Sequence, residues 1–383
     1  MVKTISPELL RQALAGDDPP VVLDTRAADA FDSWHIPGAV NFPYKPENAF
    51  NPNGFTEQTG IDQSDPIVTI CGKGKSSYAI GTKLIEAGWT DVTVVQDGME
   101  GWSRLYEVAS VPTIATALEI FQIQRVAKGC LGYVIGSPVS GEAFVIDPTR
   151  HIEEFEFIAA DDDMTITGVI DTHLHADHIS GGRALADDRD ATYYLPAATA
   201  ERDISTEFEP LERNEVISLG DIDLKFIETP GHTSDSMSIL VGGEAVLTGD
   251  TLFLDSVGRT ELQFGEADAE EGARQLFESI HGSLLSLPDG FTVLPGHFSP
   301  EKVDAITAVG SPLRTTIGSL RTDAPLLQLD RSTFVERLQS KLPEKPPNYE
   351  RMIAINAGND TPENQEEAIE LELGPNRCAI STD

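Results

Sequence analysis

Positive charge is scarce in this chain of 383 residues. Its 27 lysines and arginines stand against 63 aspartates and glutamates, which gives a formal net charge of −36. This excess of negative charge repels nucleic acid and anionic membranes, so we expect neither as a partner. Such self-repulsion destabilises a compact fold in dilute salt, and dissolved ions screen it. The composition therefore predicts a halophilic protein adapted to a salt-rich cytoplasm, which should resist unfolding better in molar KCl than in dilute buffer.

Cysteine and long apolar runs are also scarce. The three cysteines, Cys71, Cys130 and Cys378, are too few and too scattered for a disulfide framework. No uncharged apolar run approaches the ~18 residues that a membrane-spanning helix needs. The chain opens without a signal-peptide pattern, because Ser6 and Pro7 are typical of the cap and first position of a helix. We therefore expect a soluble, cytoplasmic protein.

The length exceeds that of a usual single domain, so we expect at least two. Residues 1–107 alternate helical and strand patterns, with helices at 7–15 and 76–87 and strands at 21–23, 67–70 and 91–95. Such alternation predicts an α/β domain with a parallel sheet. Residues 108–118 carry no charge and are predicted to be a linker. A pattern with a period of two residues, typical of hairpin strands, follows from residue 119.

The loop from Cys71 to Ser77 (Cys-Gly-Lys-Gly-Lys-Ser-Ser) ends a strand and opens a helix. A cysteine there lies among backbone N–H groups at the positive end of a helix dipole, which stabilise a thiolate or a persulfide anion. The pattern predicts a nucleophilic Cys71, with Lys73 and Lys75 as candidate substrate-binding residues. The alternative is a buried structural cysteine, which the two glycines and two lysines of the loop disfavour.

This loop and three other segments resemble a rhodanese domain over about the first hundred residues. The others are residues 24–26 (Asp-Thr-Arg), 35–43 and 97–102 (Asp-Gly-Met-Glu-Gly-Trp). The resemblance implies that Cys71 accepts a sulfane sulfur as a persulfide and passes it to another thiol. Thiosulfate and sulfite are the other partners that it implies. Ser76 stands where the commonest form of the family's loop has arginine, which leaves the sulfur donor open.

A second candidate site begins with a cluster of histidines that follows a predicted strand at 166–170. The cluster comprises His173, His175, Asp177 and His178. Three later strands, each followed by a glycine turn, lead to His232, Asp250 and His297. Polar residues at the carboxyl ends of strands converge on one edge of a fold, so the spacing predicts a metal site. Taken alone, seven nitrogen and oxygen ligands with a bridging Asp250 would suit two metal ions that activate water for hydrolysis.

These segments resemble the signature of the metallo-β-lactamase fold. The resemblance implies a four-layer αβ/βα sandwich, which we place at 119–310, with a short helical C-terminal extension at 311–383. Two activities within this superfamily keep the whole motif. An enzyme of the glyoxalase II type would bind two Zn²⁺ and hydrolyse a thioester. A persulfide dioxygenase would bind one Fe²⁺ with His173, His232 and Asp250, and His175, Asp177, His178 and His297 would orient these ligands and carry protons.

Two features favour the persulfide dioxygenase. The segment 257–262 (Val-Gly-Arg-Thr-Glu-Leu) resembles a Gly-Arg-Thr-acidic segment of that family. Its Arg259 is a candidate to bind the carboxylate of a thiol carrier, the alternative being an ion pair with an acidic neighbour. The second feature is the fusion, because a rhodanese transfers the sulfane sulfur that a persulfide dioxygenase oxidises to sulfite.

We therefore expect a dioxygenase that acts on a low-molecular-weight thiol persulfide with O2, coupled to sulfur transfer through Cys71. The first alternative is a glyoxalase II-like hydrolase, and the second is a non-catalytic sulfur carrier or sensor. A homo-oligomer is compatible with the sequence. Cys130 is expected to be a small buried apolar residue and Cys378 to be passive. Helical runs are predicted at 301–308 and 333–342 of the C-terminal part.

Overall fold

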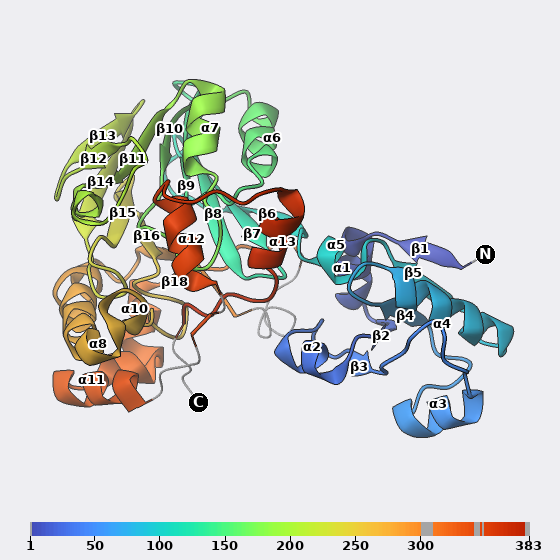
Figure 1. The fold of residues 1–383 in the computed structure, drawn as a ribbon. Coiled ribbons are helices and arrows are strands. Elements are labelled where there is room, and N and C mark those ends of the chain that lie inside the picture. The colour runs from blue at the N-terminus through green and yellow to red at the C-terminus, as the bar shows by residue number, and fades with distance from the viewer. Residues whose placement is uncertain (1, 300–308, 341–344, 347, 380–383) are drawn as a thin grey trace.

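The computed structural model describes residues 2–299, 309–340, 345–346 and 348–379. The helix predicted at 301–308 lies outside these residues. Figure 1 shows a smaller N-terminal unit beside a larger unit that contains two sheets. No helix in the described ranges is both long enough and apolar enough to cross a membrane.

The N-terminal unit is a parallel sheet of five strands in the order β1-β5-β4-β2-β3. Its strands are β1 (Lys3–Ile5), β2 (Val21–Asp24), β3 (Val40–Asn41), β4 (Ile67–Ile70) and β5 (Val92–Val95). Its helices are α1 (Pro7–Leu14), α2 (Ala28–Ser33), α3 (Pro52–Thr59), α4 (Lys75–Glu86) and α5 (Gly98–Trp102). The predicted parallel α/β domain is confirmed. Helix α1 begins where expected because the Ser6 side chain accepts a hydrogen bond from the Leu9 N–H and Pro7 fills the first helical position.

The larger unit has two mixed sheets. One has the order β12-β11-β10-β9-β8-β7-β6 and the other β13-β14-β15-β16-β17-β18. The first contains β6 (Tyr106–Val111), β7 (Glu119–Arg125), β8 (Cys130–Ser137), β9 (Glu142–Ile146), β10 (Thr165–Ile170), β11 (Thr192–Pro196) and β12 (Glu209–Leu211). The second contains β13 (Val216–Leu219), β14 (Ile222–Glu228), β15 (Met237–Val241), β16 (Ala245–Gly249), β17 (Thr292–Pro295) and β18 (Thr315–Thr316).

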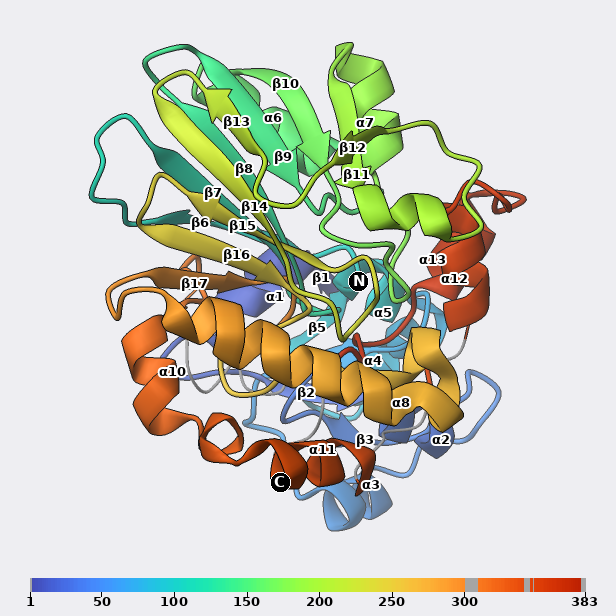
Figure 2. The same ribbon diagram turned by 90° about the vertical axis from the view of Figure 1, so that its left-hand side faces the viewer.

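Three apolar clusters join these sheets and their helices into four layers. Side chains such as Ile135 and Phe226 fill the space between the two sheets. On the outer side of the first sheet, α6 (Glu153–Asp161) and α7 (Gly182–Arg189) pack over β10. On the outer side of the second, the cluster includes α8 (Glu261–Glu278), α10 (Ile317–Asp323) and α11 (Arg331–Ser340). Figure 2 shows α8 and α11 stacked below this sheet. The predicted αβ/βα sandwich is confirmed.

The linker predicted at 108–118 overlaps a strand at its start. Residues 108–111 belong to β6, which pairs antiparallel with β7 from Tyr106 opposite Arg125 to Val111 opposite Ile120. The absence of charge in residues 108–111 reflects a partly buried strand and not a flexible linker, because the side chains of Ala109 and Val111 are only 1% and 3% exposed. The first sheet of the larger unit therefore begins shortly after α5. The domain limits that the sequence suggested stay a prediction.

The C-terminal extension ends in two short helices, α12 (Tyr349–Asn356) and α13 (Gln365–Leu371). Figure 1 shows them in red at the edge of the sandwich, with α13 next to the N-terminal unit. An ion pair between Lys73 and Glu366 of α13 crosses this boundary at 2.5 Å. The last described residues, 372–379, return from α13 to the carboxyl ends of the strands.

Candidate functional site

Cys71 lies directly after β4, whose four residues are all buried. Its sulfur accepts a hydrogen bond from the Gly74 N–H at 3.1 Å and lies 3.3 Å from the Ser77 hydroxyl oxygen. Burial would raise the pKa of the Cys71 thiol, but hydrogen bonds with Ser76 and Ser77 outweigh this and lower the pKa below its ordinary value. The geometry thus supports the thiolate predicted from the loop, at the opening of α4.

The start of α5 supports this loop from behind. The Met99 N–H donates to the Cys71 carbonyl at 2.7 Å, and the Glu100 N–H donates to the Gly72 carbonyl at 3.1 Å. Gly98 is required between them because a Cβ at this position would collide with the Cys71 carbonyl. The segment 97–102 therefore holds the cysteine loop, which accounts for its place in the rhodanese-like pattern.

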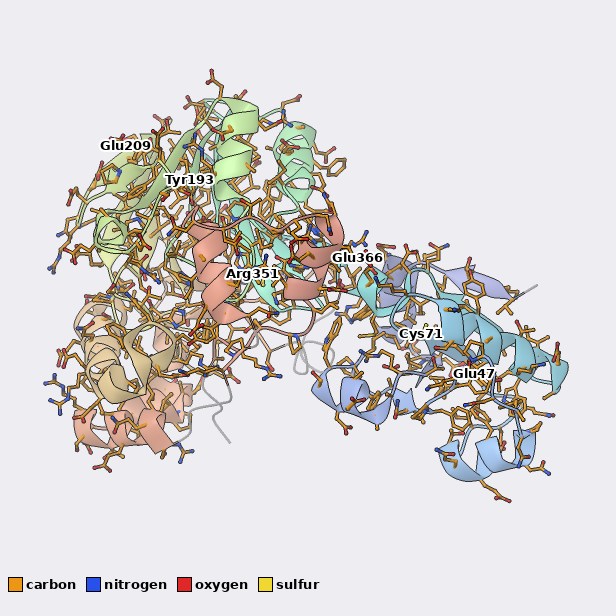
Figure 3. All side chains as sticks on the ribbon, in the orientation of Figure 1. Glu47, Cys71, Tyr193, Glu209, Arg351 and Glu366 are labelled. Carbon is orange, nitrogen blue, oxygen red and sulfur yellow. The ribbon has the colours of Figure 1, made fainter. Side chains whose placement is uncertain are left out.

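A hollow of about 340 Å³ lies beside the loop and is lined by Lys73, Gly74, Lys75, Tyr78, Gln96 and Asp97. The ammonium group of Lys73 is exposed, and it pairs with Glu366 at 2.5 Å and with Glu100 at 3.9 Å. Figure 3 labels Glu366 and Cys71, on α13 and in the N-terminal unit respectively. The charge of Lys73 is thus shared with the C-terminal extension. Substrate binding by Lys73 and Lys75 stays a prediction.

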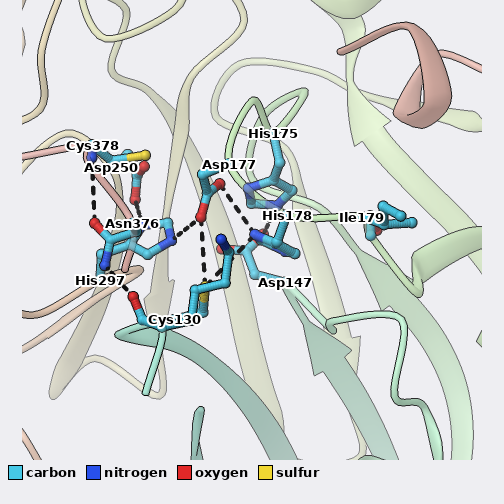
Figure 4. A network of polar contacts seen from close by, with 12 residues as sticks. Cys130, Asp147, His175, Asp177, His178, Ile179, Asp250, His297, Asn376 and Cys378 are labelled. Atoms are coloured by element: carbon cyan, nitrogen blue, oxygen red, sulfur yellow. Dashed lines mark hydrogen bonds and ion pairs between the residues drawn. The ribbon is translucent and has the colours of Figure 1, made fainter. Parts of the chain in front are cut away.

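The structure brings all seven predicted metal-site residues together. His173, His175, Asp177 and His178 follow β10, His232 follows β14, Asp250 follows β16 directly and His297 follows β17. None of the seven is more than 5% exposed. Figure 4 shows several of these side chains converging at the carboxyl ends of the strands. Buried polar groups in such number need partners, and their individual contacts divide them into two sets.

The first set is His173, His232 and Asp250, whose ligand atoms all lie within 4.8 Å of one another. The Asp250 Oδ2 atom is 3.8 Å from the His173 Nε2 atom and 3.5 Å from the His232 Nε2 atom. His173 Nε2 and Asp250 Oδ2 are buried without a hydrogen-bond partner among the described residues. Because a buried polar atom without a partner is costly, this arrangement fits a cation held by the three side chains.

The proton positions of both imidazoles suit this role. His232 Nδ1 donates to the Arg259 carbonyl at 2.7 Å, which leaves its Nε2 lone pair free. His173 Nδ1 lies 3.0 Å from the Thr172 hydroxyl oxygen. Burial and the neighbouring His175 hold the pKa of His173 well below its ordinary value, so this ring is neutral. Gly258 packs so closely against the site that a Cβ at this position would collide with the Asp250 carbonyl.

The second set is a hydrogen-bonded chain behind Asp250. His297 donates from Nδ1 to Asp250 Oδ1 at 2.5 Å and from Nε2 to Asp177 Oδ2 at 2.8 Å. Asp177 Oδ1 accepts from His178 Nδ1 at 3.1 Å. Both His297 nitrogens face carboxylate oxygens, so both carry protons. Burial lowers the pKa of His297, but the charges of Asp250 and Asp177 raise this pKa well above its ordinary value. Burial likewise opposes protonation of His178, but Asp177 raises its pKa to about 9.

His175 turns away from the first set. Its Nε2 atom donates to Asp147 Oδ1 at 3.2 Å and lies 3.7 Å from Asp171 Oδ1. Burial would lower the pKa of His175, but these two carboxylates raise it well above the ordinary value. Asp147 also accepts from the Thr172 N–H at 2.7 Å, so the same carboxylate holds the backbone beside His173. Asp147 and Asp171 were not among the predicted site residues.

Arg259 does not face an open site. Its side chain is fully buried and pairs with Glu261, whose Oε1 accepts from the Arg259 Nε at 2.5 Å. Its Nη1 donates to the Arg377 carbonyl at 3.0 Å. The structure therefore favours the alternative stated for this residue, an ion pair with an acidic neighbour. Its contribution to the site is the carbonyl that fixes His232.

The C-terminal extension supplies contacts that the sequence did not predict. The Asn356 amide donates to the carbonyls of His175 and His178 and accepts from the Ser180 N–H. Glu372 is buried, accepts from the Ile179 N–H at 2.9 Å and pairs with Arg125 and Arg150 at 3.0 and 2.8 Å.

The two other cysteines also lie at the site. Cys130 is buried as predicted, and its sulfur is 3.5 Å from Asp177 Oδ2. Cys378, expected to be passive, places its sulfur within 4.8 Å of ligand atoms of both Asp250 and His297. Burial and the negative charges of Asp177 and Asp250 raise the pKa of Cys378. No sequence pattern around Cys378 predicted this position.

Comparison with known proteins matches two families in the same order. Residues 6–105 match the rhodanese-like domain and residues 127–297 match the metallo-beta-lactamase superfamily. The chain is 26% identical over 238 residues to the mitochondrial persulfide dioxygenase ETHE1 of Bos taurus, covering 60% of this chain and 85% of the relative. It is 33% identical over 128 residues to a hydroxyacylglutathione hydrolase of Hahella chejuensis, covering 31% of this chain and 46% of the relative. The crystal structure of ETHE1 from Myxococcus xanthus is similar with a TM-score of 0.53 and 28% identity, covering 62% of this chain and 98% of that one.

Proposed function

Because the chain belongs to the metallo-beta-lactamase superfamily and carries a rhodanese-like domain before it, we propose that it is a persulfide dioxygenase coupled to sulfur transfer. The reaction converts a low-molecular-weight thiol persulfide, O2 and water into the free thiol and sulfite. Both atoms of O2 join the terminal sulfur, and the third oxygen of sulfite comes from water. The similarity to persulfide dioxygenases over most of their length supports this proposal.

The observation that carries the proposal is the division of the seven metal-site residues into two sets. His173, His232 and Asp250 supply two imidazoles and one carboxylate whose ligand atoms lie within 4.8 Å of one another, which is the ligand set of mononuclear non-haem iron. His297 has both nitrogens engaged with carboxylates, and His175 donates to Asp147. This division supports one Fe²⁺ rather than two metal ions.

The three ligands would hold Fe²⁺, which when bound supplies the redox chemistry that joins O2 to sulfur. The other groups orient these ligands and move protons. Thr172 and the Arg259 carbonyl fix the tautomers of His173 and His232. His297 holds Asp250 Oδ1, and through Asp177 it connects the ligand to His178. These buried groups form a hydrogen-bonded chain from Asp250 to His178, along which a proton could move within the site.

The N-terminal domain would exchange sulfur with the same substrates. The lowered pKa of Cys71 favours the thiolate that attacks a sulfane sulfur, and the Gly74 N–H would stabilise the persulfide that results. Its partners would be thiosulfate or sulfite and a low-molecular-weight thiol. Sulfite made at the metal site and sulfane sulfur carried on Cys71 are the two halves of thiosulfate, which gives the fusion a chemical reason.

A metal-dependent thioester hydrolase is the second candidate. Ligand atoms of Cys130, Asp177, His178 and His297 lie within 4.8 Å of one another beside the first set, a spacing that could hold a second ion. The similarity to a hydroxyacylglutathione hydrolase favours this candidate over the matched residues.

Metal analysis of the natively purified full chain separates the two. The dioxygenase requires about one iron per chain, and that iron should be lost in His232→Ala. Two zinc ions per chain, together with hydrolysis of an acylglutathione and no uptake of O2, would refute the proposal.

A further inference from the structure

The Lys73 side chain lies where the Cys71 site meets the C-terminal extension. It lines the hollow of about 340 Å³ beside the cysteine loop together with Gly74, whose N–H donates to the Cys71 sulfur at 3.1 Å. The Lys73 ammonium donates to the Glu366 carboxylate of α13 at 2.5 Å. Figure 3 shows Glu366 at the edge of α13 that is next to the N-terminal unit. A cation of the hollow thus already has a carboxylate partner from the far end of the chain.

Glu366 is the main partner of Lys73. The Glu100 carboxylate is farther away, at 3.9 Å, and it also pairs with Arg104 at 2.8 Å. The hydrogen bond and the charge of Glu366 raise the pKa of Lys73, and the charges of Glu100 and Glu370 add to this. Lys73 therefore keeps its positive charge, and the carboxylates around it offset the attraction that this charge would exert on an anion.

The helix that carries Glu366 is held in place by the metal-binding unit. Glu367, the next residue, pairs with Arg351 of α12 at 2.6 Å. On the inner face of α13, Ala368 and Leu371 are buried in an apolar cluster with Met352 of α12. A fixed helix therefore presents the Glu366 carboxylate to Lys73, and the contact joins the two units of the chain.

We propose that Glu366 is a specificity-determining residue of the Cys71 site, which disfavours sulfur donors with two negative charges relative to thiol persulfides. The inference rests on the proposed sulfur transfer through Cys71. An anion in the hollow competes with Glu366 for Lys73 and is repelled by the carboxylate. Both effects grow with the charge of the anion. Thiosulfate carries two negative charges, whereas cysteine persulfide carries one net negative charge.

The two donors undergo the same exchange at Cys71. The Cys71 thiolate attacks the outer sulfur of thiosulfate, a sulfur–sulfur bond forms at Cys71, and the bond within thiosulfate breaks as sulfite leaves with the electron pair. With a thiol persulfide, the same attack releases a thiolate. Because Glu366 weakens the binding of the dianion more, Cys71 would draw its sulfur from persulfides, and thiosulfate formed in the reverse exchange with sulfite would leave as a product.

Steady-state kinetics of the full-length chain with the two donors test this inference. At about 0.1 M KCl, Glu366→Gln should lower the KM for thiosulfate by about two- to fivefold with kcat unchanged, the effect of one exposed ion pair. The KM for cysteine persulfide should fall by less, because its net charge is smaller. In about 1 M KCl the difference from the wild type should shrink, since the screening length falls from about 10 Å to about 3 Å.

Two further variants show whether the effect passes through Lys73. Glu86→Gln is the matched control, because Glu86 is an exposed residue that pairs with Lys83 at 2.8 Å at the other end of α4. It should leave both KM values unchanged. The double variant Lys73→Gln/Glu366→Gln should lose the gain for thiosulfate, because the freed lysine is absent. An unchanged KM for thiosulfate in Glu366→Gln, an equal gain in Glu86→Gln, or a gain that persists in the double variant would overturn the proposal.

Thiosulfate binding to Cys71→Ser, measured by calorimetry, separates this inference from the proposed function. This variant lacks the nucleophile, so binding is measured without turnover. Adding Glu366→Gln should tighten binding by the same factor of about two to five. Tighter binding in a protein whose wild type transfers no sulfur would keep the specificity and refute the proposed transfer. Equal binding in a protein whose wild type does transfer sulfur would refute the specificity alone.

Discussion

The sulfur of Cys71 and the metal centre differ in how much of the chain surrounds them. The groups that contact the Cys71 sulfur come from the loop that follows it, through Gly74 and Ser77. The residues of the metal centre follow four different strands, and Asn356, Glu372 and Cys378 of the C-terminal extension lie against these residues or the loop that carries them. We therefore expect the Cys71 site to tolerate substitutions in distant parts of the chain. The metal centre should be weakened by substitutions in the distant residues that contact it.

The largest expected effect is a complete separation of the two activities. Asp250→Ala should reduce O2 uptake with glutathione persulfide by more than about 100-fold, because even residues that only support a metal ligand contribute ten- to 100-fold. Sulfur transfer from thiosulfate to a thiol should be unchanged in this variant. Cys71→Ser should give the reverse pattern. Loss of both activities in either variant would mean that the two sites are not independent.

Removal of the buried charge of Glu372 should destabilise the metal-binding unit. Burial opposes ionisation, but Arg125, Arg150 and Lys128 lower the pKa of Glu372 to about 2 from 4.5. Because the folded pKa is lowered, its stabilisation is present above pH 4.5 and is lost as the pH falls towards 2. Glu372→Gln should therefore lower the free energy of unfolding by about 3–5 kcal/mol at pH 7, measured by urea denaturation.

The matched control for this variant is Glu366→Gln in α13, the helix that ends just before Glu372. Glu366 is exposed and pairs with Lys73 at the surface, so we expect no measurable change in unfolding. Equal destabilisation by the two variants would contradict the difference between the buried and exposed ion pairs. Sulfur transfer by Cys71 should be unaffected in Glu372→Gln.

A smaller effect is expected from Asn356→Ala. Its amide holds the carbonyls of His175 and His178, so its loss should loosen the histidine loop and weaken metal affinity by about ten- to 100-fold in a chelator competition. Asn359→Ala is the control, because the Asn359 amide donates to the Asp203 carbonyl on the exposed side of the same segment. An affinity equal to that of the control would show that α12 does not support the site.

The smallest effect concerns the pH dependence of sulfur transfer. Hydrogen bonds with Ser76 and Ser77 lower the pKa of Cys71, so the thiolate persists to lower pH than that of a free thiol. Removal of either hydroxyl raises the pKa of Cys71, so the acidic limb of the rate profile should move to higher pH in Ser76→Ala and in Ser77→Ala. A movement towards lower pH would contradict this account.

The same contrast explains what the sequence could predict. The Cys71 loop and the cluster His173–His178 were recognised because strand, turn and functional residue are adjacent in the chain. The four-layer fold was implied by the resemblance of these segments to the metallo-β-lactamase signature. Arg259 was expected to bind substrate because its neighbour Glu261 could not be told from other acidic residues before the fold brought them together.

Two further features that the sequence did not predict have the same physical origin. Residues 108–111 lack charge, and only the pairing of β6 with β7 shows that they are a buried strand. Cys378 lies 128 positions after Asp250 and 81 after His297, so its approach to both depends on the path of residues 372–379. Such contacts arise from tertiary structure and leave no local pattern.

The most direct test of the proposed function measures O2 consumed and sulfite formed when glutathione persulfide is added to the iron-loaded full-length protein. We predict that one O2 is consumed for each sulfite formed. O2 consumption and sulfite formation should both be lost in Asp250→Ala and both be retained in Cys71→Ser. Hydrolysis of an acylglutathione without consumption of O2 would contradict the proposed function.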